Sequence, residues 1–163
     1  MARILPDGWR ELAVTGAAQR EIETLARLAE GLSDQYTVYH AVHWTNLEQG
    51  FAVFGDADFV LVNASGDLLL IEQKSGFLNE TPDGLVTTYG GRRRLLAVQL
   101  TRTRDALQAK LHARPGTQHL RLETLFYCPD YHVKSPPTAG LLAERLIDAP
   151  RREQLLPTIR AIL

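Results

Sequence analysis

Two carboxylates and a lysine, Asp58, Glu72 and Lys74, are the side chains of this sequence whose types and spacing could carry chemistry. They lie within residues 55–76, where two apolar and often branched runs flank the turn-forming residues 64–66. This pattern predicts a β-hairpin. Because side chains alternate between the two faces of a strand, the hairpin sets both acids and the lysine on one surface. We take that surface as the candidate functional site.

The predicted register brings the two acids face to face. With a three-residue loop, Val60 lies opposite Leu70. The next pair on the same face is Asp58 and Glu72, and directly opposed side chains lie about 4.5–5.5 Å apart at Cβ, where like charges are destabilising. A positive charge is therefore expected between them, either Lys74 or a divalent cation with hard oxygen ligands. The alternative is a salt-bridged strand end, and a four-residue loop would weaken the opposition of the acids.

The order of these residues resembles a known family. Asp58 followed by Glu72-Gln73-Lys74 resembles the PD-(D/E)xK signature of the restriction-endonuclease-like nucleases, with Ala57 where the signature has proline. More narrowly, residues 15–127 resemble the nuclease-related domain, NERD. That resemblance rests on four features in order: Gly16 and Glu21 on a first helix, the strand YTVYHAVHW, the hairpin, and a later helix that carries Gln99.

The resemblance implies a metal-dependent nuclease with an α/β restriction-endonuclease-like fold, an αβββαβ core whose mixed central sheet is flanked by helices. It implies Mg²⁺ or Mn²⁺ as the cofactor. The implied ligands are Asp58, Glu72, the backbone carbonyl of Gln73, and Glu21. The resemblance further implies that Lys74 orients or helps to deprotonate the attacking water, and that Gln99 supports the geometry of the site.

For Glu21, Gln99 and the two strand histidines, the residues themselves leave more than one interpretation open. Glu21 lies at the border of an apolar stripe, so it can face a cleft or pair on the surface with Arg20 or Arg27. Gln99 is either a residue on the inner edge of its helix or a surface glutamine. His40 and His43 are three apart on a predicted strand, which favours structural or surface positions over a shared metal.

Composition indicates one ordinary globular domain, with 163 residues of which 45% are hydrophobic and 23% charged. The single cysteine, Cys128, excludes an internal disulfide and a multi-cysteine zinc cluster, so a cytoplasmic protein is expected. The sequence shows no secretory signal and no apolar run approaching the roughly 20 residues of a membrane span, so we expect no contact with a membrane.

The charges are unevenly distributed along a chain whose net charge is −1. Residues 87–121 contain eight Lys or Arg and one acid, whereas residues 1–86 contain five Lys or Arg and 13 acids. A basic segment beside an acidic site is typical of phosphate binding, although a solvated helix face has the same composition. The candidate contacts to the DNA backbone are Arg92, Arg93, Arg94, Arg102 and Arg104.

Periodicity and turn residues predict the elements that position these side chains. We expect an irregular arm over residues 1–14 and a single domain over 15–163, with a core over about 15–128 and a helical extension over 138–163. We expect the whole chain to be part of a longer protein. The expected elements are a helix over 15–33, strands over 36–44, 56–62, 67–74 and 85–89, a loop over 77–82, a helix over 92–112, a strand over 120–127, a loop over 130–137, and two short helices around 146–149.

These observations predict a metal-dependent nuclease domain that hydrolyses DNA phosphodiester bonds. From the resemblance, we expect a role in DNA repair or processing and a fused or associated helicase. The alternative is a noncatalytic module of the same fold that binds nucleic acid or recruits a protein. A small-molecule hydrolase would instead require a closed apolar pocket and no open basic groove.

Overall fold

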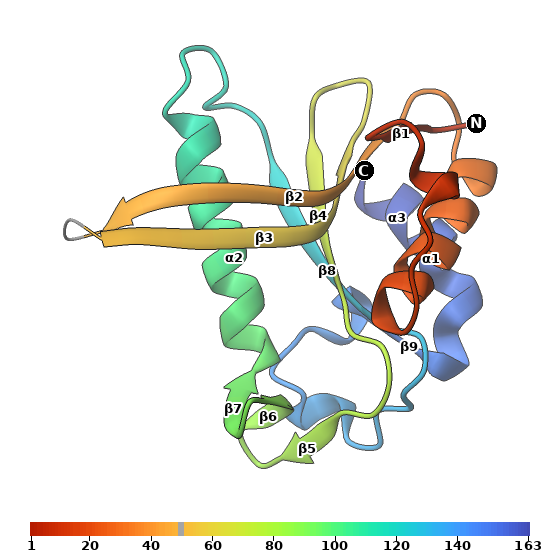
Figure 1. Ribbon diagram of the computed structural model, residues 1–163, viewed down its shortest axis with the longest axis vertical. Coiled ribbons are helices and arrows are strands. Elements are labelled where there is room, and N and C mark those ends of the chain that lie inside the picture. Colours follow the sequence, from red (N-terminus) through yellow and green to blue (C-terminus); the bar gives the residue numbers. More distant parts are fainter. Residues whose placement is uncertain (49–50) are drawn as a thin grey trace.

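The computed structural model describes residues 1–48 and 51–163, and its main element is a six-stranded mixed sheet (Figure 1). The strand order is β1-β2-β3-β4-β8-β9, and β2, β3 and β4 pair antiparallel while the other neighbours pair parallel. The strands are β1 (Arg3–Leu5), β2 (Thr37–Glu48), β3 (Phe51–Val62), β4 (Leu68–Gln73), β8 (Leu122–Cys128) and β9 (Leu146–Asp148). The predicted α/β class with a mixed sheet and flanking helices is confirmed.

Helices cover both faces of this sheet, with α1 and α3 on one side and α2 on the other (Figure 1). Side-chain alternation along β4 explains how one strand serves both layers. Leu69 and Ile71 pack with α1 and α3, whereas Leu68 and Leu70 pack with α2. The helices are α1 (Ala17–Gly31), α2 (Leu96–His112) and α3 (Leu155–Ile162), with 3-10 turns at η1 (Trp9–Glu11), η2 (Pro136–Thr138), η3 (Ala143–Arg145) and η4 (Ala149–Gln154).

The β3–β4 hairpin has the predicted register, with Val60 opposite Leu70. Its turn is built by Asn63, whose side-chain oxygen accepts hydrogen bonds from the backbone N–H groups of Ser65 and Asp67, both at 3.0 Å. Gly66 has a φ of +86°, which glycine adopts without the steric cost that a Cβ brings. The local turn chemistry therefore fixes the register, and with it the face on which each strand residue lies.

Residues 92–95 form a strand, so the prediction of a helix that begins at Arg92 is wrong at its start. A separate three-stranded sheet contains β5 (Asn79–Thr81), β6 (Gly84–Tyr89) and β7 (Arg92–Leu95). Gly90 and Gly91 both have positive φ, at +57° and +75°, as a two-residue hairpin turn of type I′ requires. The chain therefore turns back as a strand, and α2 begins only at Leu96. The predicted loop over 77–82 likewise contains β5.

The two ends of the chain also differ from expectation. The arm predicted as irregular contains β1, which pairs parallel with β2 at the edge of the sheet and buries Ile4. Residues 146–148, predicted as part of two short helices, form β9 beside β8, and only the later α3 is an α-helix there. Strands of three residues carry too little periodicity to be recognised locally. Within the described ranges, no helix has the length and apolar character needed to cross a membrane.

Candidate active site

Asp58 lies where the β3–β4 ladder stops. The last pair of the ladder is Phe59 with Ile71. Beyond it, the Asp58 carboxylate, in place of a backbone carbonyl, accepts a hydrogen bond from the neighbouring strand. Its Oδ2 accepts a hydrogen bond from the backbone N–H of Gln73 at 2.8 Å. The side chain is thus held at the end of the hairpin by the strand that carries the second acid.

Glu72 and Lys74 lie on that second strand and form an ion pair. Lys74 Nζ is 2.9 Å from Glu72 Oε1. Glu72 is only 5% exposed, whereas the Lys74 side chain is 27% exposed at the edge of the site. The backbone of Lys74 is fixed as well, because its N–H donates to the carbonyl of Tyr127 on β8 at 2.9 Å. The structure therefore brings together the three residues that the sequence singled out.

The two carboxylates are short of compensating positive charge. Burial raises the pKa of Asp58 to about 7, and repulsion from Glu72 adds to this effect, while the hydrogen bond from Gln73 opposes it. Burial also raises the pKa of Glu72, against the attraction of Lys74, with repulsion from other acids contributing. One lysine does not offset the charge of two buried carboxylates, so the site favours binding of a proton or a further cation.

Lys74 itself is held in its charged form. Burial taken alone would lower the pKa of its ammonium group, but the attraction of Glu72 and the hydrogen bond between them outweigh burial, so the pKa lies above its ordinary value. At neutral pH this lysine is protonated. It can donate hydrogen bonds and offset negative charge, but it does not act as a base in this state.

Glu21 lies close to the acidic pair but is bonded elsewhere. Its Oε2 is 2.8 Å from Nε2 of His40, whose ring stacks on Phe59 with centroids 5.5 Å apart. The alternative of a surface pair with Arg20 or Arg27 is not what the structure has, because Arg20 pairs with Glu23 and Arg27 with Glu153. The charge of Glu21 nevertheless contributes to the raised pKa of both Asp58 and Glu72. The charge of Glu21 therefore acts on the candidate site, while its carboxylate has His40 as a structural partner that the sequence did not indicate.

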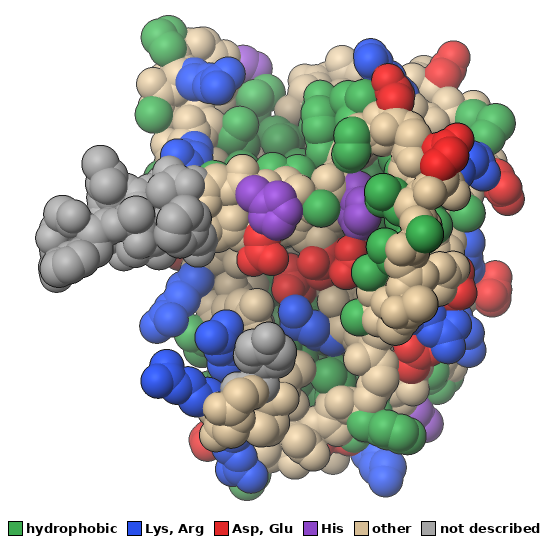
Figure 2. Space-filling view, viewed as in Figure 1, with side chains coloured by type: hydrophobic (Ala, Val, Ile, Leu, Met, Phe, Trp, Pro, Cys, Tyr) green, Lys and Arg blue, Asp and Glu red, His purple; other side chains and the backbone are tan. Residues whose placement is uncertain are grey.

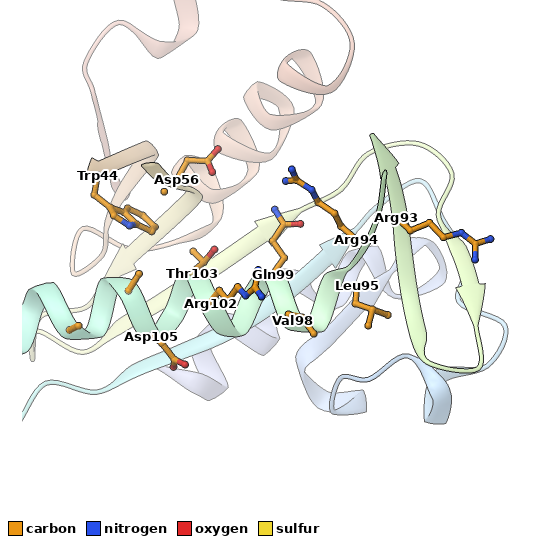
Figure 3. A pocket seen from close by; sticks show the side chains of 13 residues that line it. Trp44, Asp56, Arg93, Arg94, Leu95, Val98, Gln99, Arg102, Thr103 and Asp105 are labelled. Atoms are coloured by element: carbon orange, nitrogen blue, oxygen red, sulfur yellow. The ribbon is translucent and has the colours of Figure 1, made fainter. Parts of the chain in front are cut away.

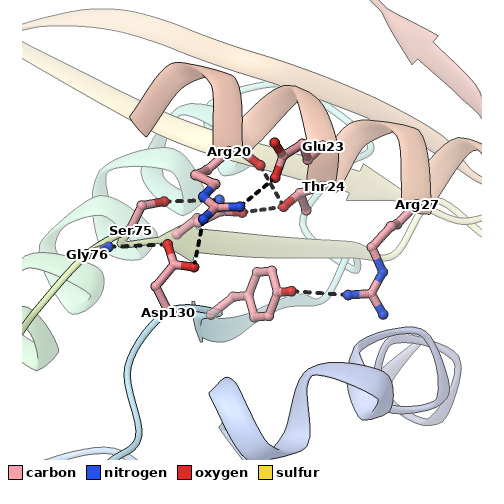
Figure 4. A network of polar contacts seen from close by, with 9 residues as sticks. Arg20, Glu23, Thr24, Arg27, Ser75, Gly76 and Asp130 are labelled. Atoms are coloured by element: carbon pink, nitrogen blue, oxygen red, sulfur yellow. Dashed lines mark hydrogen bonds and ion pairs between the residues drawn. The ribbon is translucent and has the colours of Figure 1, made fainter. Parts of the chain in front are cut away.

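Polar contacts from α1 fix the end of β4 from the opposite side (Figure 4). The buried hydroxyl of Thr24 donates to Oε1 of Gln73 at 2.7 Å. Beyond the strand, Asp130 accepts a hydrogen bond from the backbone N–H of Gly76 at 3.3 Å and lies 3.5 Å from Arg20. These contacts clamp the Glu72-Gln73-Lys74 segment between α1 and the loop after β8.

A cleft of about 1200 Å³ lies beside the acidic residues, and we refer to it as the α2 cleft (Figure 3). Gln99 is half-buried in its wall, which places this residue on the inner side of its helix. The cleft separates α2 and β7 from the β2–β3 ribbon. Its other lining residues are Trp44, Gly55, Asp56, Arg93, Arg94, Leu95, Val98, Arg102, Thr103, Asp105, Ala106 and Ala109.

The five candidate arginines do not form one surface. Arg94 and Arg102 line the α2 cleft, and Arg94 extends toward Gln99 while Arg93 extends away from it (Figure 3). Arg92 is exposed on β7 outside the cleft lining. Arg104 pairs with its neighbour Asp105 at 2.9 Å, so its charge is already offset. The basic segment therefore divides into arginines that face the cleft and arginines that do not.

Asp56 is an acidic residue of the site that our sequence interpretation missed. It is exposed in the α2 cleft, and its charge contributes to the raised pKa of both Glu72 and Lys74. It precedes Asp58 by two residues on the same strand, so the alternation rule could have placed both on one face. Figure 2 shows acidic side chains gathered beside histidines across the middle of one face, with Lys and Arg side chains below them.

The carboxylate oxygens of the site suit a hard divalent cation that takes its other ligands from water and substrate. Among the described residues, no three or more His, Cys, Asp or Glu side chains are grouped closely enough to hold a metal ion by themselves. Asp58 and Glu72 nevertheless supply two carboxylates that lack compensating charge. Mg²⁺ is usually bound through one or two carboxylates together with waters and substrate phosphates, rather than in an all-protein cage. The residues present therefore fit Mg²⁺ or Mn²⁺ shared with a phosphate substrate.

No family model matches the sequence, and no curated protein matches it. The geometry of the site therefore carries the functional argument.

Proposed function

We propose that this chain is a Mg²⁺- or Mn²⁺-dependent nuclease domain that hydrolyses phosphodiester bonds in DNA. The observation that carries the proposal is the half-buried Asp58 beside the buried Glu72, with Lys74 2.9 Å from Glu72. The order α1-β2-β3-β4-α2-β8, in which the small sheet β5-β6-β7 is inserted between β4 and α2, supports the restriction-endonuclease-like core that the sequence resemblance implies. A role in DNA repair or processing beside a helicase is part of the same proposal.

The acidic residues would hold the cation. Asp58 and Glu72 are the principal ligands, and the backbone carbonyl of Gln73 and the carboxylate of Glu21 are the candidates for completing the set. A bound divalent cation neutralises charge on the phosphate and lowers the pKa of water, which are the needs of phosphodiester hydrolysis. The chain's own contribution is to keep both carboxylates largely shielded from solvent, oriented, and short of positive charge.

The remaining polar residues act on water and phosphate. Because Lys74 is protonated at neutral pH, we assign it to orienting the attacking water and offsetting the charge that develops on the phosphate. Gln99 supports the geometry from the wall of the α2 cleft. Arg94 and Arg102 are exposed in that cleft, and we assign them to contacts with backbone phosphates, which position a nucleic acid without reading its sequence.

A cleavage assay on single-stranded, duplex and branched DNA tests the proposal. Cleavage should require Mg²⁺ or Mn²⁺, stop with a chelator, and be lost in Asp58→Asn and in Glu72→Gln. The matched control is Asp67→Asn, because Asp67 lies on the same hairpin but pairs with Arg121 away from the site. If DNA binds and is never cut with either metal, the noncatalytic module replaces the nuclease.

A further inference from the structure

The α2 cleft is separate from the acidic pair, since none of Asp58, Glu72 and Lys74 lines it. Its volume of about 1200 Å³ exceeds the roughly 300–1,000 Å³ of pockets that enclose small ligands. Its lining extends along α2 from Val98 to Ala109, and the cleft is partly open to solvent. This shape suits a segment of an extended polymer better than a single small molecule.

An aromatic ring is fixed on one wall of the cleft. Trp44 lies opposite Gly55 in the β2–β3 ladder, and its indole packs directly on the glycine backbone. A Cβ added at Gly55 would lie 2.3 Å from both Cε2 and Nε1 of the ring, so only glycine permits this packing. The ring is half-buried and also lines the cleft. It therefore forms a held platform for another flat group.

Positive charge dominates the rest of the cleft. Three arginines line it against two aspartates, and one of these aspartates, Asp105, is already paired with Arg104. Arg94 and Arg102 are exposed and form no ion pair with any residue in the described part of the chain. Two unpaired guanidinium groups in the same cleft as an aromatic ring complement a nucleic-acid strand, which has charged phosphates and flat bases.

We propose that the α2 cleft binds single-stranded DNA, with an unpaired base stacked on Trp44 and the neighbouring phosphates held by Arg94 and Arg102. In a duplex the bases are stacked inside the helix, so a half-buried ring in a cleft reaches a base face only when the strand is unpaired. This inference names the substrate class of the proposed nuclease and rests on that function. Asp56 joins the two sites, since it lines the cleft and its charge acts on Glu72.

Oligonucleotide binding is measured in the presence of a chelator, so that binding in the cleft is tested without metal-dependent cleavage. Fluorescence anisotropy of labelled oligothymidylate, a matched duplex and oligouridylate gives the affinities. Trp44→Leu should weaken oligothymidylate binding about 5- to 150-fold, the loss expected for one stacked base, whereas Trp44→Phe should retain most of the affinity. Arg94→Gln and Arg102→Gln should each make the dependence of log affinity on log salt shallower by about 0.7 to 1 unit.

The matched control for charge is Arg152→Gln, because Arg152 lies in η4 on the α1 side of the sheet, where its carbonyl accepts from Arg27. This variant should bind like the unmodified protein. The inference is overturned if Trp44→Leu binds oligothymidylate normally while remaining folded, if the duplex binds more tightly than the single strand, or if oligouridylate binds more tightly than oligothymidylate. Trp44-dependent binding without metal-dependent cleavage would retain the inference and overturn the proposed nuclease.

Discussion

Replacing Asp58 by asparagine should stabilise the protein at neutral and alkaline pH, although it removes a proposed metal ligand. The pKa of Asp58 rises from 3.8 to about 7 on folding, so the folded state disfavours the charged carboxylate. Each pKa unit corresponds to about 1.36 kcal/mol, which makes the cost of the charge about 4 kcal/mol at most. The asparagine oxygen can still accept the hydrogen bond from Gln73, so the variant loses the charge without losing the contact.

The sign of the pH dependence follows from the direction of the shift. A carboxyl group with a raised pKa contributes its full stability below about pH 4 and loses it as pH rises through about 7. The advantage of Asp58→Asn should therefore be absent near pH 4, grow to about 2–4 kcal/mol at pH 8, and raise the melting temperature by at least about 4 °C there. Urea denaturation across this pH range measures it.

The control for this prediction is the same substitution at Asp67. Arg121 hydrogen-bonds to Asp67 and lowers the pKa of its carboxyl group, so Asp67→Asn should have no stabilising effect at pH 8. Adding Mg²⁺ should raise the melting temperature of the unmodified protein but not of Asp58→Asn, because only the former keeps both carboxylates. If Asp58→Asn is no more stable than the unmodified protein at pH 8, Asp58 does not carry an unfavourable buried charge.

Three further substitutions test neighbouring contacts. Lys74→Ala should abolish cleavage, and it should destabilise the fold more at pH 8 than at pH 5, because it leaves the Glu72 charge buried without its partner. A loss of melting temperature that is equal at the two pH values would contradict this. Gly55→Ala should displace the Trp44 ring and shift its fluorescence, and an unchanged emission spectrum would contradict the packing. Thr24→Val should cost about 1–3 kcal/mol in urea denaturation, with Thr24→Ser recovering most of it, since it removes a buried hydrogen bond.

The hairpin could be predicted from sequence because its information is local. Alternation along 56–62 and 67–74 fixed the faces, and the three-residue loop fixed the register that the structure has. The same rule applied once more would have included Asp56. What alternation could not indicate is the break in the ladder at Asp58, because there a side chain replaces a backbone acceptor.

The predictions were wrong for strands whose pairing partners are distant in sequence and for a helix start next to a strong turn signal. β1 and β9 exist because they find parallel partners in β2 and β8, and such short segments have no detectable period of their own. The predicted helix over 92–112 starts too early because Gly90-Gly91 forms a tight hairpin turn before Arg92. Both glycines have positive φ, and this turn sends Arg92, Arg93 and Arg94 back along β6 as a strand.

Two features that each reduce the stability of the fold lie at one position of the sheet. They help to decide between a salt-bridged strand end and a functional site. The pairing of β2 with β3 is interrupted at Ala41, which has a φ of +53°, a conformation that costs a residue with a side chain about 1–3 kcal/mol. The register places Ala41 opposite Asp58, whose half-buried carboxylate with its raised pKa is the second cost. The ion pair of Lys74 with Glu72 explains neither feature. Strain and unfavourable charge at one point are what a site poised for a cation requires, and this favours the functional interpretation.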